Sequence, residues 1–173
     1  NGSYDDAFDL TIQASHEFGW YCRNTGYNPF TAEGKKTAGL EIWEWMETFH
    51  PNLQGKHLAV FVSVGDGNII SGIHKGFKDL FALGWLKKMP RIFGVQAEGS
   101  APLVLGHPVD NPETIATAIR IGRPARGEQA LLAAEESRGR IIAVSDDELL
   151  TMQRLLAASG VWVEPASAAG VAG

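Results

Sequence analysis

A glycine-rich corner between an apolar strand and an amphipathic helix is the clearest candidate for chemistry in the chain. It reads Gly65-Asp66-Gly67-Asn68-Ile69. Two glycines at a strand-to-helix turn let backbone N–H groups at the helix start converge on an anion, usually a phosphate, and the Asn68 side chain adds a donor. Many α/β connections use glycine only to turn the chain. The corner therefore predicts a phosphate site, with a plain turn as the alternative.

Other groupings that would support catalysis are missing from the sequence. Ser63 and Ser71 lack a His–acid partner pattern, and the corner lacks the Gly-Lys-Ser/Thr ending of a P-loop. The corner also matches the dinucleotide pattern G-x-G-x-x-G imperfectly. No metal site is expected, because the histidines have no metal-ligand spacing. They are His16, His50, His57, His74 and His107.

Composition is that of a soluble α/β protein. A chain of 173 residues can hold one domain with a sizeable core. The net charge of −5 and the lack of a basic run argue against a nucleic-acid or anionic-membrane partner. Cys22 is the only cysteine, so no intrachain disulfide forms, and no signal peptide or long apolar span is present. We expect a cytoplasmic protein, and the start without methionine suggests a piece of a longer one.

Hydrophobic periodicity predicts strands and helices in alternation around the corner, which is typical of a parallel sheet with right-handed crossovers. The expected fold class is α/β, a three-layer αβα arrangement. Loops are expected at 24–34 and, with a short surface helix, at 123–138. Strands are expected at 57–64, 91–96 and 141–144, and helices at 5–21, 37–49, from the corner to 83, 112–121, 146–158 and in the last ten residues.

Two kinds of local signal sharpen these expectations. Asp5 or Asp6 is expected to cap the first helix, and Asn111, followed by proline and glutamate, to begin another. Gly72 and Gly76 lie one turn apart on the helix after the corner. Their spacing predicts a close approach by another backbone.

Several phrases in order along the chain resemble the threonine synthase branch of the fold type II pyridoxal-phosphate enzymes. That group also contains threonine dehydratase, cysteine synthase and the tryptophan synthase β subunit. The resemblance implies a partial domain of that fold, with residues 1–50 as the end of the smaller domain and a crossover helix, and 51–173 as part of the larger cofactor-binding domain. The phrases are NPF at 28–30, EGKKT at 33–37, the corner, GVQAEG at 94–99, ETIATAIRIG at 113–122, IAVSD at 142–146 and EPASAA at 164–169.

The resemblance implies that the corner binds the phosphate of pyridoxal 5′-phosphate, mainly through backbone N–H groups. The residues concerned are Gly65, Asp66, Gly67, Asn68 and Ile69. The commoner family form has one more residue before the final Gly-Asn. By the same resemblance, Ile121 and Gly122 would lie near the pyridine ring.

A covalent anchor for the cofactor is not expected in this chain. In similar enzymes the Schiff-base lysine lies near the N-terminus in a Ser-x-Lys-Asp-like context, which does not occur here, and the partner of the pyridine nitrogen would lie beyond Gly173. Lys35 and Lys36 belong to the Glu-Gly-x-Lys-Thr phrase. We therefore expect no catalytic residue here, an inactive fragment, and an active full-length protein, as a homodimer by resemblance.

The substrate implied by the resemblance is a small amino acid, and its identity stays open. Asn24 and Thr25 take the place of an Asn-Ser pair that helps hold the phosphate of O-phosphohomoserine, but Thr31 stands where an arginine is expected. The first hypothesis is a lyase that converts O-phosphohomoserine to threonine and phosphate. The second is an amino-acid dehydratase or a threonine-synthase-like paralogue with another substrate. The third is a non-catalytic module that binds a phosphate ligand.

Overall fold

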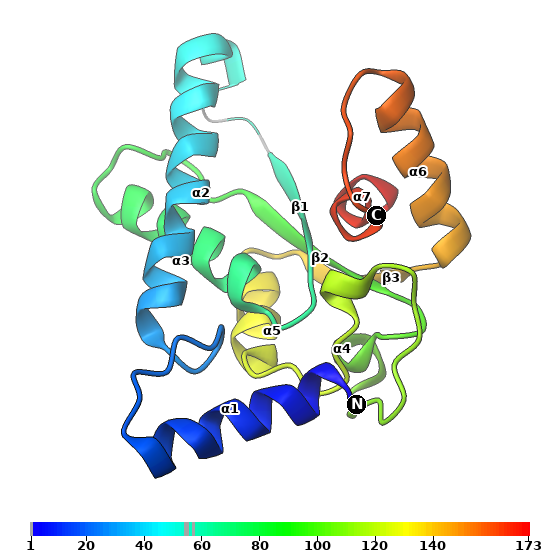
Figure 1. Ribbon diagram of the computed structural model, residues 1–173. Helices are drawn as coiled ribbons and strands as arrows, with labels where there is room; N and C mark the ends of the chain where they lie inside the picture. Colours follow the sequence, from blue (N-terminus) through cyan, green and yellow to red (C-terminus); the bar gives the residue numbers. More distant parts are fainter. Residues whose placement is uncertain (1, 54–55, 57) are drawn as a thin grey trace.

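Three parallel strands form the centre of the protein, with helices on both sides (Figure 1). The computed structural model describes residues 2–53, 56 and 58–173. The strands are β1 (Ala59–Ser63), β2 (Arg91–Ala97) and β3 (Arg140–Val144), in the order β1-β2-β3. The predicted strands and the α/β fold class are confirmed. His57, the first residue of the predicted strand 57–64, lies outside the described residues.

The helices make two layers around the sheet. The connections between strands run through α3 (Asn68–Ala82) and α5 (Gly127–Glu136), which pack against each other and against the strands. On the other side, α7 (Pro165–Ala172) contacts β1 and β2, and α6 (Asp146–Ala158) packs on α7. In Figure 1 the sheet separates α3 and α5 from α6 and α7, so both faces are covered, as parallel sheets require.

The core is divided by the sheet because successive side chains of a strand point to opposite faces. On β2, Ile92 contributes to the cluster that contains Phe77 of α3 and Ala130 of α5. Val95, on the opposite face of β2, belongs to a second cluster with residues of α6 and α7. The expected short surface helix within 123–138 is α5, whose inner face is buried in the core rather than at the surface.

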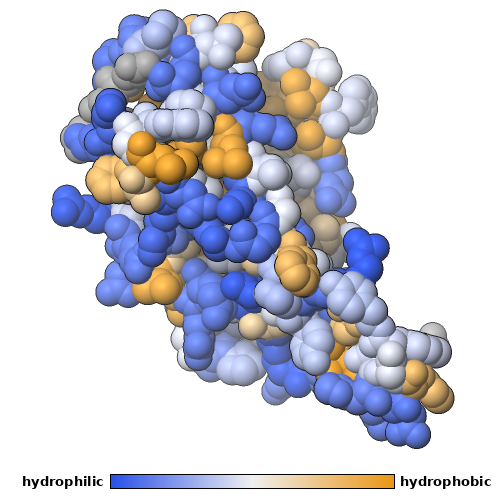
Figure 2. All heavy atoms as spheres, turned by 90° about the vertical axis from the view of Figure 1, so that its left-hand side faces the viewer, coloured by the Kyte–Doolittle hydropathy of each residue, from blue (hydrophilic) through white to orange (hydrophobic). Residues whose placement is uncertain are grey.

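Helix α2 (Pro29–Phe49) packs along α3 on the outside of the sheet. The predicted close approach at the helix glycines is confirmed: a methyl group on Gly72 would lie 2.7 Å from Lys35 Cβ, and one on Gly76 would lie 2.5 Å from the carbonyl oxygen of Lys36. The two helices therefore meet at backbone distance. Figure 2 shows the face that carries them as largely hydrophilic.

Helix α1 (Tyr4–Phe18) projects from the rest of the protein, at the lower right of Figure 2. Ser15 is its only buried residue among those described, and the Phe18 side chain is 62% exposed. The remaining short elements are η1 (Pro51–Leu53), α4 (Pro102–Leu105) and η2 (Thr117–Ile119). No described helix combines the length and apolar character needed to cross a bilayer.

The first two helices begin at residues other than those predicted. Ser3 caps α1, since its hydroxyl accepts from the N–H of Asp6 while the Asp6 carboxylate accepts from Ser3. The predicted cap at Asp5 or Asp6 is therefore wrong. The predicted loop 24–34 ends early, because Asn28 caps α2 by accepting from the N–H of Phe30 at 3.0 Å. Pro29 then stands at the first position of the helix, where it lacks only a donor that would be unpaired anyway.

The helix predicted from Asn111 to residue 121 is wrong. Only the short turn η2 forms there, because contacts distant in sequence hold the chain in an irregular path. The Asp146 carboxylate accepts from the Thr114 hydroxyl at 2.5 Å and from the N–H of Ile115 at 3.1 Å. The N–H of Glu113 donates to the carbonyl oxygen of Gly99 at 3.0 Å. By contrast, the predicted helix 146–158 forms as α6, which begins with a capping box of Ser145 and Glu148.

Candidate functional site

The glycine corner lines a cleft of about 510 Å³ at the carboxyl end of β1. Ligands of open parallel sheets bind at this end of the strands. One wall comes from α2, another from the chain around η2 and the start of α7. The polar and corner residues in the lining are Tyr4, Thr25, Lys35, Ser63, Gly65, Asp66, Gly67, Asn68, Ile69, Glu164 and Ser167.

Both glycines of the corner are required by their surroundings. Gly67 has φ +87°, a left-handed conformation that favours glycine, and a methyl group there would overlap the carbonyl oxygen of Arg126. A methyl group on Gly65 would lie 2.9 Å from the Cα of Ile119. The corner is therefore packed between η2 and the chain just before α5, and neither glycine position has room for a side chain.

The first turn of α3 has no side-chain cap, although it opens on the cleft. The N-termini of α1, α2 and α6 are each capped by the side chain of Ser3, Asn28 or Ser145, whereas α5 and α7, like α3, have no side-chain cap. The first N–H groups of a helix have no partner within it, and they favour a negative charge. An uncapped helix start beside a glycine turn is therefore chemically suited to the phosphate of a ligand.

Asp66 holds the corner against the loop before α5. Its Oδ1 accepts from the N–H of Ala125 at 2.7 Å, and its backbone carbonyl accepts from the N–H of Arg126 at 3.0 Å. The side chain is buried, and Oδ2 has no partner among the described residues. Burial raises the pKa of the Asp66 carboxyl, while the hydrogen bond from Ala125 and the charge of Arg126 act in the opposite direction.

Asn68 is oriented by a hydrogen bond across to α2. Its Nδ2 donates to Thr31 Oγ1 at 3.1 Å, and the Thr31 hydroxyl donates in turn to the carbonyl oxygen of Asn28 at 2.7 Å. The side chain is only 2% exposed, and Oδ1 has no partner among the described residues. The amide carries a second N–H, which is chemically able to donate to a ligand.

The structure separates the two residues predicted to contact the substrate. Thr25 lines the cleft, whereas Asn24 lines a shallower hollow beside α1 and donates to the carbonyl oxygen of Phe8 at 3.4 Å. The pair predicted near the pyridine ring is divided in the same way. Ile121 lines the cleft, and Gly122 lies outside its lining, where an added methyl group would overlap the carbonyl oxygen of Val109.

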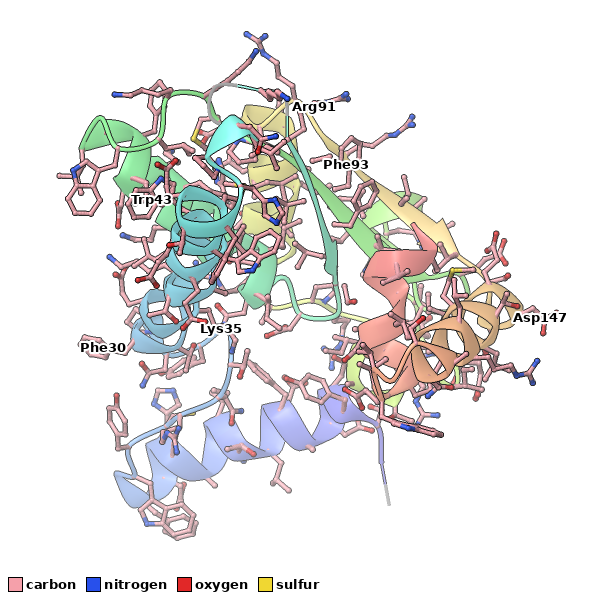
Figure 3. The ribbon with its side chains drawn as sticks, turned by 90° about the horizontal axis from the view of Figure 1, so that it is seen from above. Phe30, Lys35, Trp43, Arg91, Phe93 and Asp147 are labelled. Atoms are coloured by element: carbon pink, nitrogen blue, oxygen red, sulfur yellow. The ribbon has the colours of Figure 1, made fainter. Side chains whose placement is uncertain are left out.

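Five polar lining residues were not assigned to the site by the sequence analysis: Tyr4, Lys35, Ser63, Glu164 and Ser167. Lys35 was detectable in principle. Once α2 is taken to begin at Pro29, Lys35 lies one turn after Thr31 and shares its face. Figure 3 shows Lys35 on the cleft side of α2, while Phe30 points away from it. Tyr4 and Glu164 come from distant segments, and no local pattern marks them.

A metal centre finds no support in the part of the chain that the structure describes, where no three His, Cys, Asp or Glu side chains come together to hold an ion. The polar character of the cleft comes from backbone N–H groups, an amide, hydroxyls, one lysine and two carboxyls. Such a set suits an anionic organic ligand.

Comparison with known proteins gives one family and a consistent set of relatives. The chain matches the family described as "Pyridoxal-phosphate dependent enzyme" over residues 1–173. It is 42% identical to a threonine synthase of Mycobacterium bovis, over 100% of this chain and 46% of the relative. It is 41% identical to a threonine synthase of Methanocaldococcus jannaschii, over 99% of this chain and 43% of that protein. The chain thus spans less than half the length of these relatives.

Solved structures with the same fold are similarly longer than this chain. A threonine deaminase of T.th. superposes with a TM-score of 0.71 at 25% identity, over 95% of this chain and 57% of the other. Maize serine racemase superposes with a TM-score of 0.73 at 19% identity, over 99% of this chain and 49% of the other. The second likeness concerns the fold alone.

Proposed function

The chain belongs to the pyridoxal-phosphate-dependent enzymes, and on that basis we propose that it is part of a lyase that converts O-phosphohomoserine to threonine and phosphate. The observation that carries the proposal is the uncapped start of α3, which opens on the cleft behind the glycine corner. The similarity to threonine synthases along the whole chain supports the choice of reaction.

In this proposal the corner from Gly65 to Ile69 binds the phosphate of pyridoxal 5′-phosphate. Backbone N–H groups at the start of α3 would hold the phosphate, and Asn68 would add a side-chain donor. The bound cofactor supplies an electron sink for reaction at the substrate amino acid. The part of the chain described here binds and orients, and the rigid hold of Asp66 on the loop before α5 keeps the N–H groups in place.

The same proposal assigns roles to the segments of the full-length protein. Residues 1–50 would end the smaller domain and lead through α2 into the larger domain, which includes 51–173. The lysine that anchors the cofactor covalently would come from a segment outside this chain, so the chain alone would be inactive. The full-length protein would act on a small amino acid as a homodimer.

The experiment is an assay of the full-length protein with pyridoxal phosphate and O-phosphohomoserine. Equal amounts of phosphate and threonine are expected as products. Gly67→Ala, which disturbs the corner, should abolish the activity, whereas Gly84→Ala, at the open end of α3, should retain it. Absence of both products with a cofactor-loaded protein would reject this reaction.

An amino-acid dehydratase is the second candidate, and Thr31 favours it. A threonine hydroxyl that already donates to Asn28 offers a phosphate ester no positive charge. Release of ammonia from serine or threonine, without phosphate release from O-phosphohomoserine, would support this reaction. A full-length protein that binds phosphate but no cofactor would instead be a non-catalytic module.

A further inference from the structure

We infer that Lys35 supplies the positive charge that binds an anionic group at the far end of the amino-acid substrate. Lys35 would then determine the specificity of the cleft for such substrates over uncharged ones. This inference rests on the proposed function, because it assumes that the corner is taken by the phosphate of the cofactor. A second anion in the same cleft then needs a partner of its own.

Lys35 is held at the edge of the corner by its stem. Its Cβ packs over Gly72, one turn beyond Asn68 on α3, where a methyl group would lie 2.7 Å away. Its position four residues after Thr31 places both on the same side of α2, and Lys35 lines the cleft. Figure 3 shows the same orientation. The lysine is therefore one helical turn from the hydroxyl that orients Asn68.

The ammonium group of Lys35 is free for a ligand. No ion pair joins Lys35 to any described residue, whereas Glu33 and Asp79 beside it on α2 and α3 are both paired with other lysines. Its neighbour Lys36 pairs with Asp79 at 2.8 Å and with Glu33 at 3.2 Å, and Lys75 pairs with the other Glu33 oxygen at 3.0 Å. Two adjacent lysines thus differ in role: Lys36 joins α2 to α3, and Lys35 faces the cleft.

The positive charge of Lys35 offsets the negative charges of two acids in the cleft. Lys35 is the only basic side chain among the described residues of the lining, which also includes Asp66 and Glu164. Its positive charge reaches the corner, where it opposes the effect of burial on the pKa of Asp66. Without Lys35 these acids would repel an anionic substrate, because Coulomb repulsion is stronger in a partly buried cleft than in water.

The chemistry that Lys35 recognises is a terminal phosphate ester or carboxylate. Lysine binds either one as a point charge with three donors, and it lacks the two-pronged geometry of arginine. An uncharged hydroxy amino acid would gain nothing from it. The two anions are distinguished by experiment, by comparing kcat/KM of the wild type for O-phosphohomoserine with its kcat/KM for a dicarboxylic amino acid.

The test compares Lys35→Gln with the matched control Lys36→Gln in the full-length, cofactor-loaded protein. Lys35→Gln should lower kcat/KM for O-phosphohomoserine by about 10- to 100-fold and weaken inhibition by inorganic phosphate to a similar degree, the range expected for a charge-assisted hydrogen bond. Lys35→Arg should restore most of both. Lys36→Gln should change neither by more than about twofold, although it lowers the melting temperature by breaking the pair with Asp79.

Two further measurements separate this inference from the proposed function. The cofactor affinity of Lys35→Gln, measured by absorbance titration, should equal that of the wild type, because the cofactor phosphate is bound by the corner. If the wild type binds no cofactor, the proposed function fails, and calorimetric titration with inorganic phosphate still compares wild type with Lys35→Gln. Equal phosphate affinity, or an unchanged kcat/KM in the loaded protein, would overturn the assignment of Lys35.

Discussion

Thr31 and Asn68 are joined by a hydrogen bond of 3.1 Å that links the first turn of α2 to the first turn of α3. The direction of this bond is determined by a third group. The Thr31 hydroxyl donates to the carbonyl oxygen of Asn28, so its oxygen accepts from the amide of Asn68. The residue that stands where an arginine was expected thus orients the Asn68 side chain at the proposed phosphate site.

Replacing Asn68 should weaken cofactor binding. We expect Asn68→Ala to cost roughly 1.5–3 kcal/mol, or about a 10- to 150-fold higher dissociation constant, because a hydrogen bond to a charged phosphate is lost. Absorbance titration of the full-length protein with pyridoxal phosphate measures it. Thr31→Val keeps the Asn68 amide but removes the hydroxyl that accepts from it, and should raise the dissociation constant less. An unchanged dissociation constant in Asn68→Ala would place the phosphate elsewhere.

Gly67 should tolerate no side chain. We expect Gly67→Ala to destabilise the protein by about 1–3 kcal/mol from the left-handed backbone alone, with a further loss from overlap with Arg126. Thermal unfolding measures the sum. Gly84→Ala is the matched control, since Gly84 has φ +74° with no atom within 4 Å of the added methyl group. Equal losses in the two variants would show that the contact with Arg126 carries no energy.

The buried carboxyl of Asp66 should make stability fall as pH rises. Because burial raises its pKa in the folded state, the folded protein binds more protons than the unfolded chain at pH values from about 3.9 up to the raised pKa. Asp66→Asn keeps the oxygen that accepts from Ala125 and removes the charge. Its melting temperature at pH 7 should exceed that of the wild type, and the difference should shrink as the pH is lowered toward about 4.

Asp79 provides the control with the opposite sign. The hydrogen bond from Lys36 lowers the pKa of Asp79, so its stabilising contribution is present near neutral pH and is lost as the pH falls through the folded pKa. Asp79→Asn should therefore lower the melting temperature at pH 7. A fall of the melting temperature at pH 7 in both variants would contradict the assigned environment of Asp66.

Borohydride reduction of the cofactor-loaded full-length protein should leave the cofactor attached to a lysine outside residues 1–173. Lys36 is engaged in ion pairs, and we propose that Lys35 contacts the substrate, so we expect neither to be the anchor. Peptide mapping by mass spectrometry locates the modified residue. Modification at Lys35 or Lys36 would contradict both this prediction and the role given to Lys35.

Elements whose signals are local could be predicted from the sequence. The capping box at Ser145 pairs residues three apart, and the buried strands show as short apolar runs, so both are visible in the sequence itself. The corner was predictable for the same reason, because its glycines directly join β1 to α3. The local pattern at Asn28-Pro29 carried equal information for the start of α2, but the turn-forming residues around it favoured a loop.

The irregular chain at 111–122 could not be predicted, because its structure depends on partners distant in sequence. Asn111, a proline and an acid form a strong helix start, yet Asp146 takes the hydroxyl of Thr114 and the N–H of Ile115. The depth of Ile121 in the cleft follows from that path. The position of Lys35 beside Gly72 likewise depends on how α2 packs on α3.

The backbone contact of α2 with α3 at Gly72 and Gly76 also limits how this enzyme type can diversify. In the proposed substrate site, moving α2 outward for a larger substrate would break the contacts at Gly72 and Gly76 and the hydrogen bond from Asn68 to Thr31. The opposite wall of the cleft contains Ile119, in the short turn η2, and Ser167, near the start of α7. Relatives that accept bulkier amino acids are therefore expected to differ at this wall and to retain glycine at the positions of Gly72 and Gly76.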